Sequence, residues 1–215
     1  MRGSNTMFWT RGIPPYEWSK TAEDAQEGEG DVHATDLEGF REGTTFGTDG
    51  SGGCHSRDPV LRRCGYSAVT ITAGGPKAIF GDCPGRHTVP RAELYALACV
   101  IRLSRQPAIT VFVDPEWIVK SFYGDRRATL RGSNADLWSG LWRDLDARGG
   151  RGTVQILHIN SRRPAWHASS RVIDPEGWML NFLADAVASH AAKLYAVRKE
   201  GAQLFMHRRK RTPVV

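Results

Sequence analysis

Apolar and polar positions along the chain first mark its strands. TTFGTD, YSAVTIT and KAIFGD are rich in β-branched and aromatic residues and are separated by Gly and Pro turns, which predicts three consecutive antiparallel strands. AITVFVD and TVQILHI are continuous apolar runs of the kind that is buried in a parallel sheet. Together they predict a five-stranded mixed sheet of three antiparallel strands plus two parallel ones.

Helical periodicity appears between and after these strands. PRAELYALACVIRLSRQ has apolar residues at helical spacing behind a proline suited to a first turn, and DPEWIVKSFYG opens a short helix. NADLWSGLWRDLDARGG predicts an amphipathic helix that Asn134 caps. WMLNFLADAVASHAAKLYAVRK supplies the last helix. The pattern therefore predicts an α/β fold in which helices flank the mixed sheet.

Composition divides the chain into three predicted parts. Residues 1–43 have nine acidic and four basic side chains and no sustained periodicity, which predicts a mostly irregular acidic leader. Residues 44–195 form the predicted catalytic domain, and residues 196–215 form a basic C-terminal tail. No signal peptide is recognisable, and no apolar run approaches the roughly 20 residues of a membrane span. We expect an intracellular protein without a membrane partner, and nucleus and cytoplasm both remain open.

Charge and cysteine content narrow the chemistry. Residues 44–215 carry 25 basic and 14 acidic side chains, an excess that favours a nucleic-acid partner, although many basic proteins bind none. The four cysteines form no C-x-x-C pair, and the spacing of Cys54, His55 and Cys64 fits no common zinc site. We therefore expect reduced cysteines and no zinc.

Four carboxylates fall at the ends of predicted elements or on an otherwise apolar face: Asp49, Glu93, Asp114 and Asp185. Each also has an ordinary interpretation, since Asp114 could cap a helix and Asp185 could face solvent. If the first and fourth strands are adjacent and parallel, however, their carboxyl ends meet at the crevice where such sheets bind ligands. Gathered carboxylates repel one another unless cations hold them. The sequence thus predicts two Mg²⁺ ions, for which Mn²⁺ can substitute.

Five ordered blocks then carry a family resemblance: TDGSGG, RAELYAL, VDPEWIVKSF, NADLWSGLW and NFLADAVASHA. In order and approximate spacing they resemble the type 1 ribonuclease H family, in style closest to the ribonuclease H domains of retroelements, over about residues 44–195. The resemblance implies a ribonuclease H-like fold. It also implies an endonuclease that hydrolyses the RNA strand of RNA–DNA hybrids by two-metal-ion catalysis, leaving 5′-phosphate and 3′-hydroxyl ends.

The resemblance further implies roles for single residues. Asp49 would bridge both metal ions, Glu93 and Asp114 would complete the leaving-group metal site, and Asp185 would ligate the metal that activates water. His167, in the long loop before the last helix, would assist product release. His158 is the alternative, although we expect it to be packed or half-buried in its strand.

Contacts to the hybrid are implied for a small set of loop and helix residues: Ser51, Gly52, Arg91, Arg126, Arg127 and Arg131. A solvated loop is the alternative interpretation of the last three. The implied partner is an RNA–DNA hybrid, and the implied context is a chain that is part of, or associated with, a reverse transcriptase polyprotein.

Two other functions remain open. Val89 and Pro90 stand where many family members have hydrogen-bonding side chains, so the chain could be a catalytically weak or inactive ribonuclease H-like module that only binds nucleic acid. Transposase and integrase cores share the architecture and its clustered acids. The position of Glu93 on the first helix, and not on the last, argues against that third interpretation.

Overall fold

A mixed sheet organises the computed structural model, which describes residues 27–28, 30–160 and 174–211. The sheet has six strands in the order β2-β5-β4-β3-β7-β8, and β3 runs parallel to β7 and β7 parallel to β8. Its strands are β2 (His33–Ala34), β3 (Thr45–Ser51), β4 (Gly65–Thr72), β5 (Gly75–Asp82), β7 (Ile109–Val113) and β8 (Val154–His158). A separate two-stranded ladder joins β1 (Glu27–Gly28) to β6 (Gly85–Arg86). The predicted α/β class and mixed sheet are confirmed.

The sixth strand comes from the segment that we assigned to an irregular leader. β2 pairs antiparallel with β5, and the backbone N–H of Thr35 donates to the carbonyl of Ala78 at 3.0 Å. The short helix α3 (Leu37–Arg41) follows, capped by Asp36, and it buries Phe40 completely. A two-residue strand and a five-residue helix are too short to produce a periodic pattern, so the sequence did not predict them.

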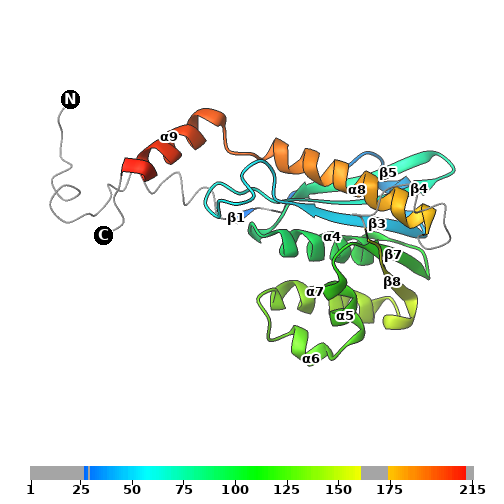
Figure 1. Ribbon diagram of the computed structural model, residues 1–215. Coiled ribbons are helices and arrows are strands. Elements are labelled where there is room, and N and C mark those ends of the chain that lie inside the picture. The colour runs from blue at the N-terminus through cyan, green and yellow to red at the C-terminus, as the bar shows by residue number, and fades with distance from the viewer. Residues whose placement is uncertain (1–26, 29, 161–173, 212–215) are drawn as a thin grey trace.

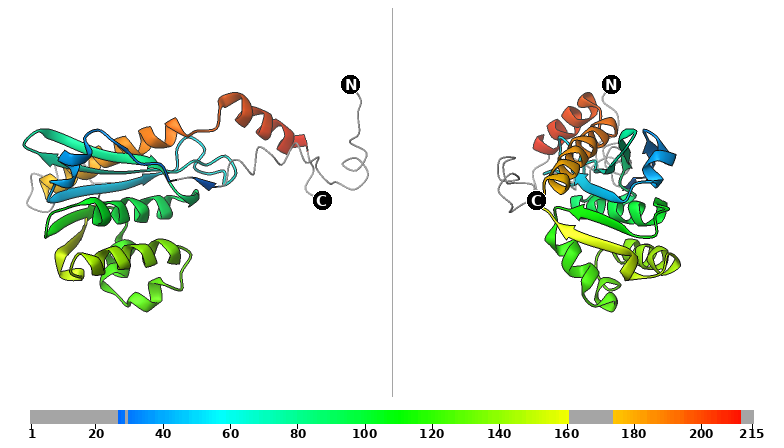
Figure 2. Two further views of the ribbon diagram at one scale, coloured as in Figure 1. Left: turned by 180° about the vertical axis from the view of Figure 1, so that it is seen from behind. Right: turned by 90° about the vertical axis from the view of Figure 1, so that its right-hand side faces the viewer.

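Helices cover both faces of the sheet. In Figure 1, α8 (Pro175–Leu194) lies along one face, while α4 (Val89–Leu103) lies on the other together with α5 (Glu116–Tyr123) and α7 (Ala135–Ala147). Short segments connect these elements: α6 (Arg126–Thr129) and the 3₁₀ turn η1 (Arg151–Thr153). Figure 2 shows the last helix, α9 (Lys199–Arg211), extending beyond the end of α8, where the sequence predicted only a basic tail.

The helix that carries Asp185 begins earlier than the sequence predicted. Its N-cap is Asp174, whose carboxylate accepts hydrogen bonds from the backbone N–H groups of Glu176 and Gly177 at 3.0 and 3.3 Å. We had assigned this Asp-Pro-Glu-Gly stretch to a loop, because Pro and Gly are typical turn residues. Over the described ranges, no helix is both long enough and apolar enough to cross a membrane.

Two apolar layers hold the helices to the sheet. Phe46 and Val113 belong to the larger cluster on the α4 side, and Phe112, Leu180 and Ala184 belong to the smaller cluster under α8. Gly47 is essential to the second contact, because a Cβ atom there would lie 2.5 Å from the backbone carbon of Leu180. Without a side chain at this position, the backbone of α8 can lie directly on β3.

Candidate active site

Strand register brings Asp49 and Asp114 together. Thr48 of β3 is the partner of Val113 in parallel β7, so the next residue along each chain, Asp49 or Asp114, stands at the same end of the sheet. Neighbouring strands lie about 4.8 Å apart. Asp114 does not cap α5, because the N-cap is Pro115 and no side chain caps that helix. The alternative interpretation of Asp114 as a helix cap is therefore wrong.

Two side-chain contacts fix α8 beside these strands. Ser67, the β4 partner of Asp49, donates from its hydroxyl to the carbonyl of Ala184 at 2.7 Å. The hydroxyl of Ser51, at the end of β3, lies 3.3 Å from that of Ser189. Because both contacts flank Asp185 along α8, they hold this exposed carboxylate next to Asp49.

The fourth acid arrives from the opposite face of the sheet. Gly50 follows Asp49, and a Cβ atom at Gly50 would lie 2.6 Å from the backbone nitrogen of Glu93. The backbone of α4 therefore packs against β3 one residue beyond Asp49. Four elements that are distant in sequence supply the four predicted carboxylates to one end of the parallel pair.

A pocket of about 220 Å³ opens between these elements, and its described lining is Asp49, Asp114, Trp178, Asn181, Phe182 and Asp185. Glu93 borders the group but does not line the pocket. Trp178, Asn181 and Phe182 were not predicted as site residues. A signal was present, since these residues precede Asp185 by seven, four and three positions and therefore share its helix face.

Burial and mutual repulsion perturb two of the acids. The pKa of Asp49 rises to about 8, first because the carboxyl is buried and then because Asp185 and Glu93 are close, whereas a hydrogen bond from the backbone of Gly50 acts in the opposite direction. The pKa of Glu93 rises to about 7 through burial and the nearby charge of Asp114. Both groups therefore favour a proton, or another cation, over bare ionisation.

Carboxylate oxygens are the ligands that Mg²⁺ and Mn²⁺ prefer, so the donor chemistry fits the predicted ions. The raised pKa values of Asp49 and Glu93 are consistent with this fit, because they indicate negative charge that lacks compensation. In the part of the chain that the structure describes, however, no three His, Cys, Asp or Glu side chains are arranged to hold a metal ion together. Metal binding would require the acidic side chains to change conformation.

Solved structures share this architecture, although no protein-family model and no curated protein matches the sequence. The native protease-reverse transcriptase of prototype foamy virus is similar with a TM-score of 0.52 at 21% identity, covering 72% of this chain and 21% of the viral one. The ribonuclease H domain of the same virus, solved in solution, gives a TM-score of 0.51 at 18% identity, covering 71% and 96%. This chain has a ribonuclease H-like fold.

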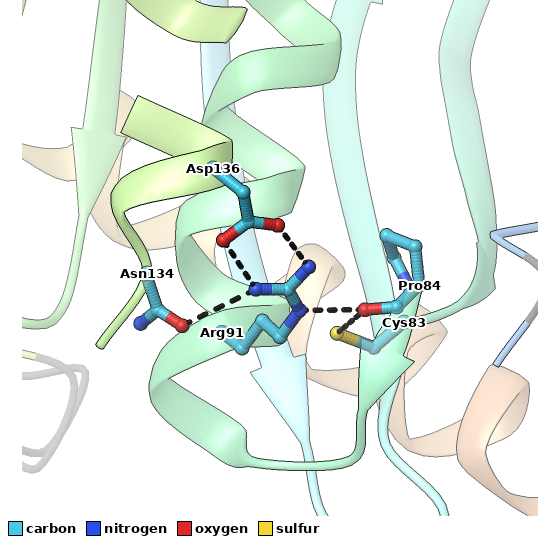
Figure 3. A network of polar contacts seen from close by, with 5 residues as sticks. All are labelled: Cys83, Pro84, Arg91, Asn134 and Asp136. Atoms are coloured by element: carbon cyan, nitrogen blue, oxygen red, sulfur yellow. Dashed lines mark hydrogen bonds and ion pairs between the residues drawn. The ribbon is translucent and has the colours of Figure 1, made fainter. Parts of the chain in front are cut away.

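Arg91, a predicted hybrid contact, has internal partners in this ribonuclease H-like fold (Figure 3). Its guanidinium donates to both carboxylate oxygens of Asp136 at 2.9 and 2.5 Å, and its Nε donates to the carbonyl of Pro84 at 2.6 Å. Asn134 starts α7 as predicted, but its side chain makes no capping bond and accepts from Arg91 at 3.5 Å. Arg91 therefore joins α4 to α7 and to the turn after β5.

The other predicted arginines lie around α6. All three are exposed, and Arg126 pairs with Asp146 at 2.8 Å and lies over the ring of Trp142. None of the three is among the described residues that line the acidic pocket. Their contact with a hybrid stays a prediction.

The remaining predicted residues divide into two groups. Ser51 and Gly52 close β3 next to the acids, and Ser51 contacts α8 as described. His167 lies outside the described residues. His158 ends β8 as the register partner of Val113, beside the strand end that carries Asp114, and it is exposed where we expected a packed or half-buried side chain.

Proposed function

We propose that this protein is a metal-dependent endonuclease that hydrolyses the RNA strand of RNA–DNA hybrids, leaving 5′-phosphate and 3′-hydroxyl ends. One observation carries the proposal. Four separate elements bring Asp49, Glu93, Asp114 and Asp185 to one end of the parallel strand pair, where the pKa values of Asp49 and Glu93 are raised. The ribonuclease H-like fold, shared with a viral domain named as a ribonuclease H, supports it.

Each acid has a distinct task in this proposal. Two bound Mg²⁺ ions would neutralise the carboxylates and stabilise the attacking and leaving oxygens of the phosphodiester. Asp49 is the most central of the four, because it interacts with both Asp185 and Glu93, and it would serve both ions. Glu93 and Asp114 would hold the ion on the leaving-group side. Asp185, exposed on α8, would hold the ion on the side that water approaches.

The substrate follows from the same proposal. A hybrid would be distinguished from duplex DNA through its 2′-hydroxyl groups, and basic side chains would hold its phosphates without reading sequence. A reverse transcriptase would be the source of such hybrids. We propose that the chain works as part of, or together with, such an enzyme, since it resembles one segment of the foamy virus protease-reverse transcriptase.

A cleavage assay tests the proposal. Labelled RNA–DNA hybrid and matched RNA and DNA duplexes are incubated with the parent protein in Mg²⁺, Mn²⁺ or EDTA, alongside Asp49→Asn and the control Glu116→Gln, which changes an exposed glutamate of α5. We expect metal-dependent cutting of only the hybrid's RNA strand by the parent and the control, and none by Asp49→Asn. Equal cutting by Asp49→Asn, with its circular dichroism unchanged, would contradict the proposal.

A second function has one observation in its favour. Because no three potential ligands are arranged around a metal ion over the described residues, the chain could bind hybrids without cutting them. That function predicts salt-sensitive hybrid binding that is no tighter in Mg²⁺ than in EDTA, and no cleavage products. Gel-shift titrations run beside the cleavage assay distinguish the two.

A further inference from the structure

An aromatic pair lies on α8 beside the acids, with Phe182 exposed and Trp178 half-buried. The rings of Trp178 and Phe182 stack with centroids 5.5 Å apart and planes 9° from parallel, and both side chains line the acidic pocket. Phe182 is 55% exposed. A large apolar ring that stays in water inside a polar pocket gains nothing for the core, and such exposure marks a binding surface.

A buried amide faces the same pocket. Asn181 is only 3% exposed and lines the pocket next to the aromatic pair. Its Oδ1 atom is buried and has no hydrogen-bond partner in the described structure. Leaving a buried acceptor unsatisfied is unfavourable, so native proteins rarely do it without a reason. A hydrogen-bond donor carried by a ligand reaches this oxygen once the Asn181 amide rotates toward the pocket that the residue lines.

We propose that Trp178, Asn181 and Phe182 form a nucleoside-binding subsite that rests on the proposed nuclease function. In this subsite a base stacks on the exposed ring of Phe182, extending the pair to three rings. The Asn181 amide rotates toward the pocket, and its Oδ1 accepts a hydrogen bond from the same nucleoside. The donor is a hydroxyl or amino hydrogen, which a ribose 2′-hydroxyl or an exocyclic base amine can both provide. The subsite orients the nucleotide whose phosphate lies at the acids.

Size and charge of the pocket favour a nucleoside over a protein partner. A volume of about 220 Å³ is below the roughly 300 to 1,000 Å³ of sites for drug-sized ligands, so one small planar group fits. Asp49, Asp114 and Asp185 line the same pocket, and three carboxylates would be desolvated unfavourably by an apolar protein segment. Base stacking adds no negative charge beside them and tolerates any sequence.

Fluorescence of 2-aminopurine tests the subsite. Hybrids carry the fluorophore at successive positions of the RNA strand, and the full-length protein binds them in Ca²⁺ while gels verify that the RNA stays intact. We expect quenching at one position by the parent and by Met179→Ala, a control that removes another exposed apolar side chain of α8, outside the described pocket lining. Phe182→Ala should abolish this quenching and raise the hybrid dissociation constant about tenfold.

Further variants separate stacking from apolar contact and identify the donor. Phe182→Tyr should keep the quenching and Phe182→Leu should lose it. For Asn181→Ala, hybrids with a single 2′-deoxy nucleotide, or with a base that lacks its exocyclic amine, are compared with the unmodified hybrid. One modification should weaken binding of the hybrid to the parent but not to Asn181→Ala. The group that this modification removes is the donor to Asn181. If neither modification distinguishes the two proteins, the role of Asn181 is overturned.

The outcomes keep this proposal separate from the nuclease function. Quenching that depends on Phe182, in a protein that does not cut, supports the subsite while the nuclease function fails. Cutting by a parent that shows no quenching at any position overturns the subsite alone. Equal weakening by Phe182→Ala and Met179→Ala also overturns it. Self-association would overturn it as well, if light scattering detects it in the parent and not in Phe182→Ala while the two bind the hybrid equally. The face would then be an interface between copies of the chain.

Discussion

Arg91 and Glu93 stand two residues apart in α4 and have opposite electrostatic surroundings. Arg91 binds Asp136 through both carboxylate oxygens, and this contact lowers the pKa of Asp136. Glu93 is buried near Asp114, and its pKa rises to about 7. The α4–α7 contact therefore neutralises its charges within the molecule, whereas the raised pKa of Glu93 favours a proton or another cation at that carboxyl.

Removing the charge of Glu93 should have the largest effect. Glu93→Gln keeps the size of the side chain but removes a proposed metal ligand, so we expect hybrid cleavage to fall about a thousandfold, which corresponds to about 4 kcal/mol of transition-state stabilisation. Steady-state cleavage rates measure this. Glu116→Gln, an exposed glutamate in the first turn of α5, is the matched control and should cut like the parent. Loss of activity in both would show that the assay reports general damage.

The acids beside β3 and the Arg91–Asp136 contact should also make opposite contributions to the pH dependence of stability. Asp49 and Glu93 have raised pKa values in the folded state, so their contribution to stability is complete below about pH 4 and is lost as the pH rises through about 7 to 8. A tenfold difference in proton affinity between the folded and unfolded states corresponds to about 1.4 kcal/mol of stability. The pKa of Asp136 is lowered, so its contribution is present above about pH 4 and is lost at lower pH.

Urea denaturation at pH 5 to 9 in EDTA measures the first effect. The unfolding free energy of the parent should fall across this range, that of Asp49→Asn should fall less, and Mg²⁺ should restore part of the loss at pH 8. A parent whose slope equals that of Asp49→Asn would mean that Asp49 ionises normally in the folded protein.

Displacing α8 should have an intermediate effect. In Gly47→Ala the new methyl group meets the backbone of Leu180, and we expect a loss of about 1 to 3 kcal/mol of stability together with weaker cleavage, because α8 carries Asp185. Thermal unfolding and the cleavage assay report the two effects. Gly140→Ala in α7 is the matched control, since nothing lies within 4 Å of its added Cβ, and it should stabilise the protein by about 0.5 to 1 kcal/mol. Equal stabilities for the two variants would contradict the close packing of α8 on β3.

Breaking the ion pair between Arg91 and Asp136 should have the smallest effect. A double-mutant cycle of Arg91→Ala and Asp136→Ala should give a coupling energy of about 1 kcal/mol, because Arg91 is largely buried but Asp136 is exposed. The exposed pair of Glu116 and Lys120 should give about 0.3 to 0.5 kcal/mol in the same experiment. A coupling near zero for Arg91 would leave this side chain available for phosphate contacts.

Sequence periodicity predicted the elements that carry the acids. The apolar runs around Asp49 and Asp114 became the adjacent parallel strands β3 and β7, and α4 and α8 bring Glu93 and Asp185 as expected. These predictions succeeded because burial of a sheet face or a helix stripe imposes a regular spacing on the sequence.

Contacts between distant residues left no such pattern. Arg91 and Asp136 are 45 positions apart, so only the folded packing of α4 on α7 reveals that the arginine is occupied. The burial of Asn181 likewise depends on the sheet beneath α8. The helix α9 was not predicted for a different reason. The basic run at its end is typical of a solvated tail, although good helix formers precede it.

Gly47 and Gly50 leave two positions of β3 without a side chain, one beneath α8 and one beneath α4. At these two positions the helices that carry Asp185 and Glu93 approach β3 by direct contact between backbones. Contacts between backbones can persist while many other residues are substituted. An architecture shared with the foamy virus domain at 18% identity is what this kind of construction permits.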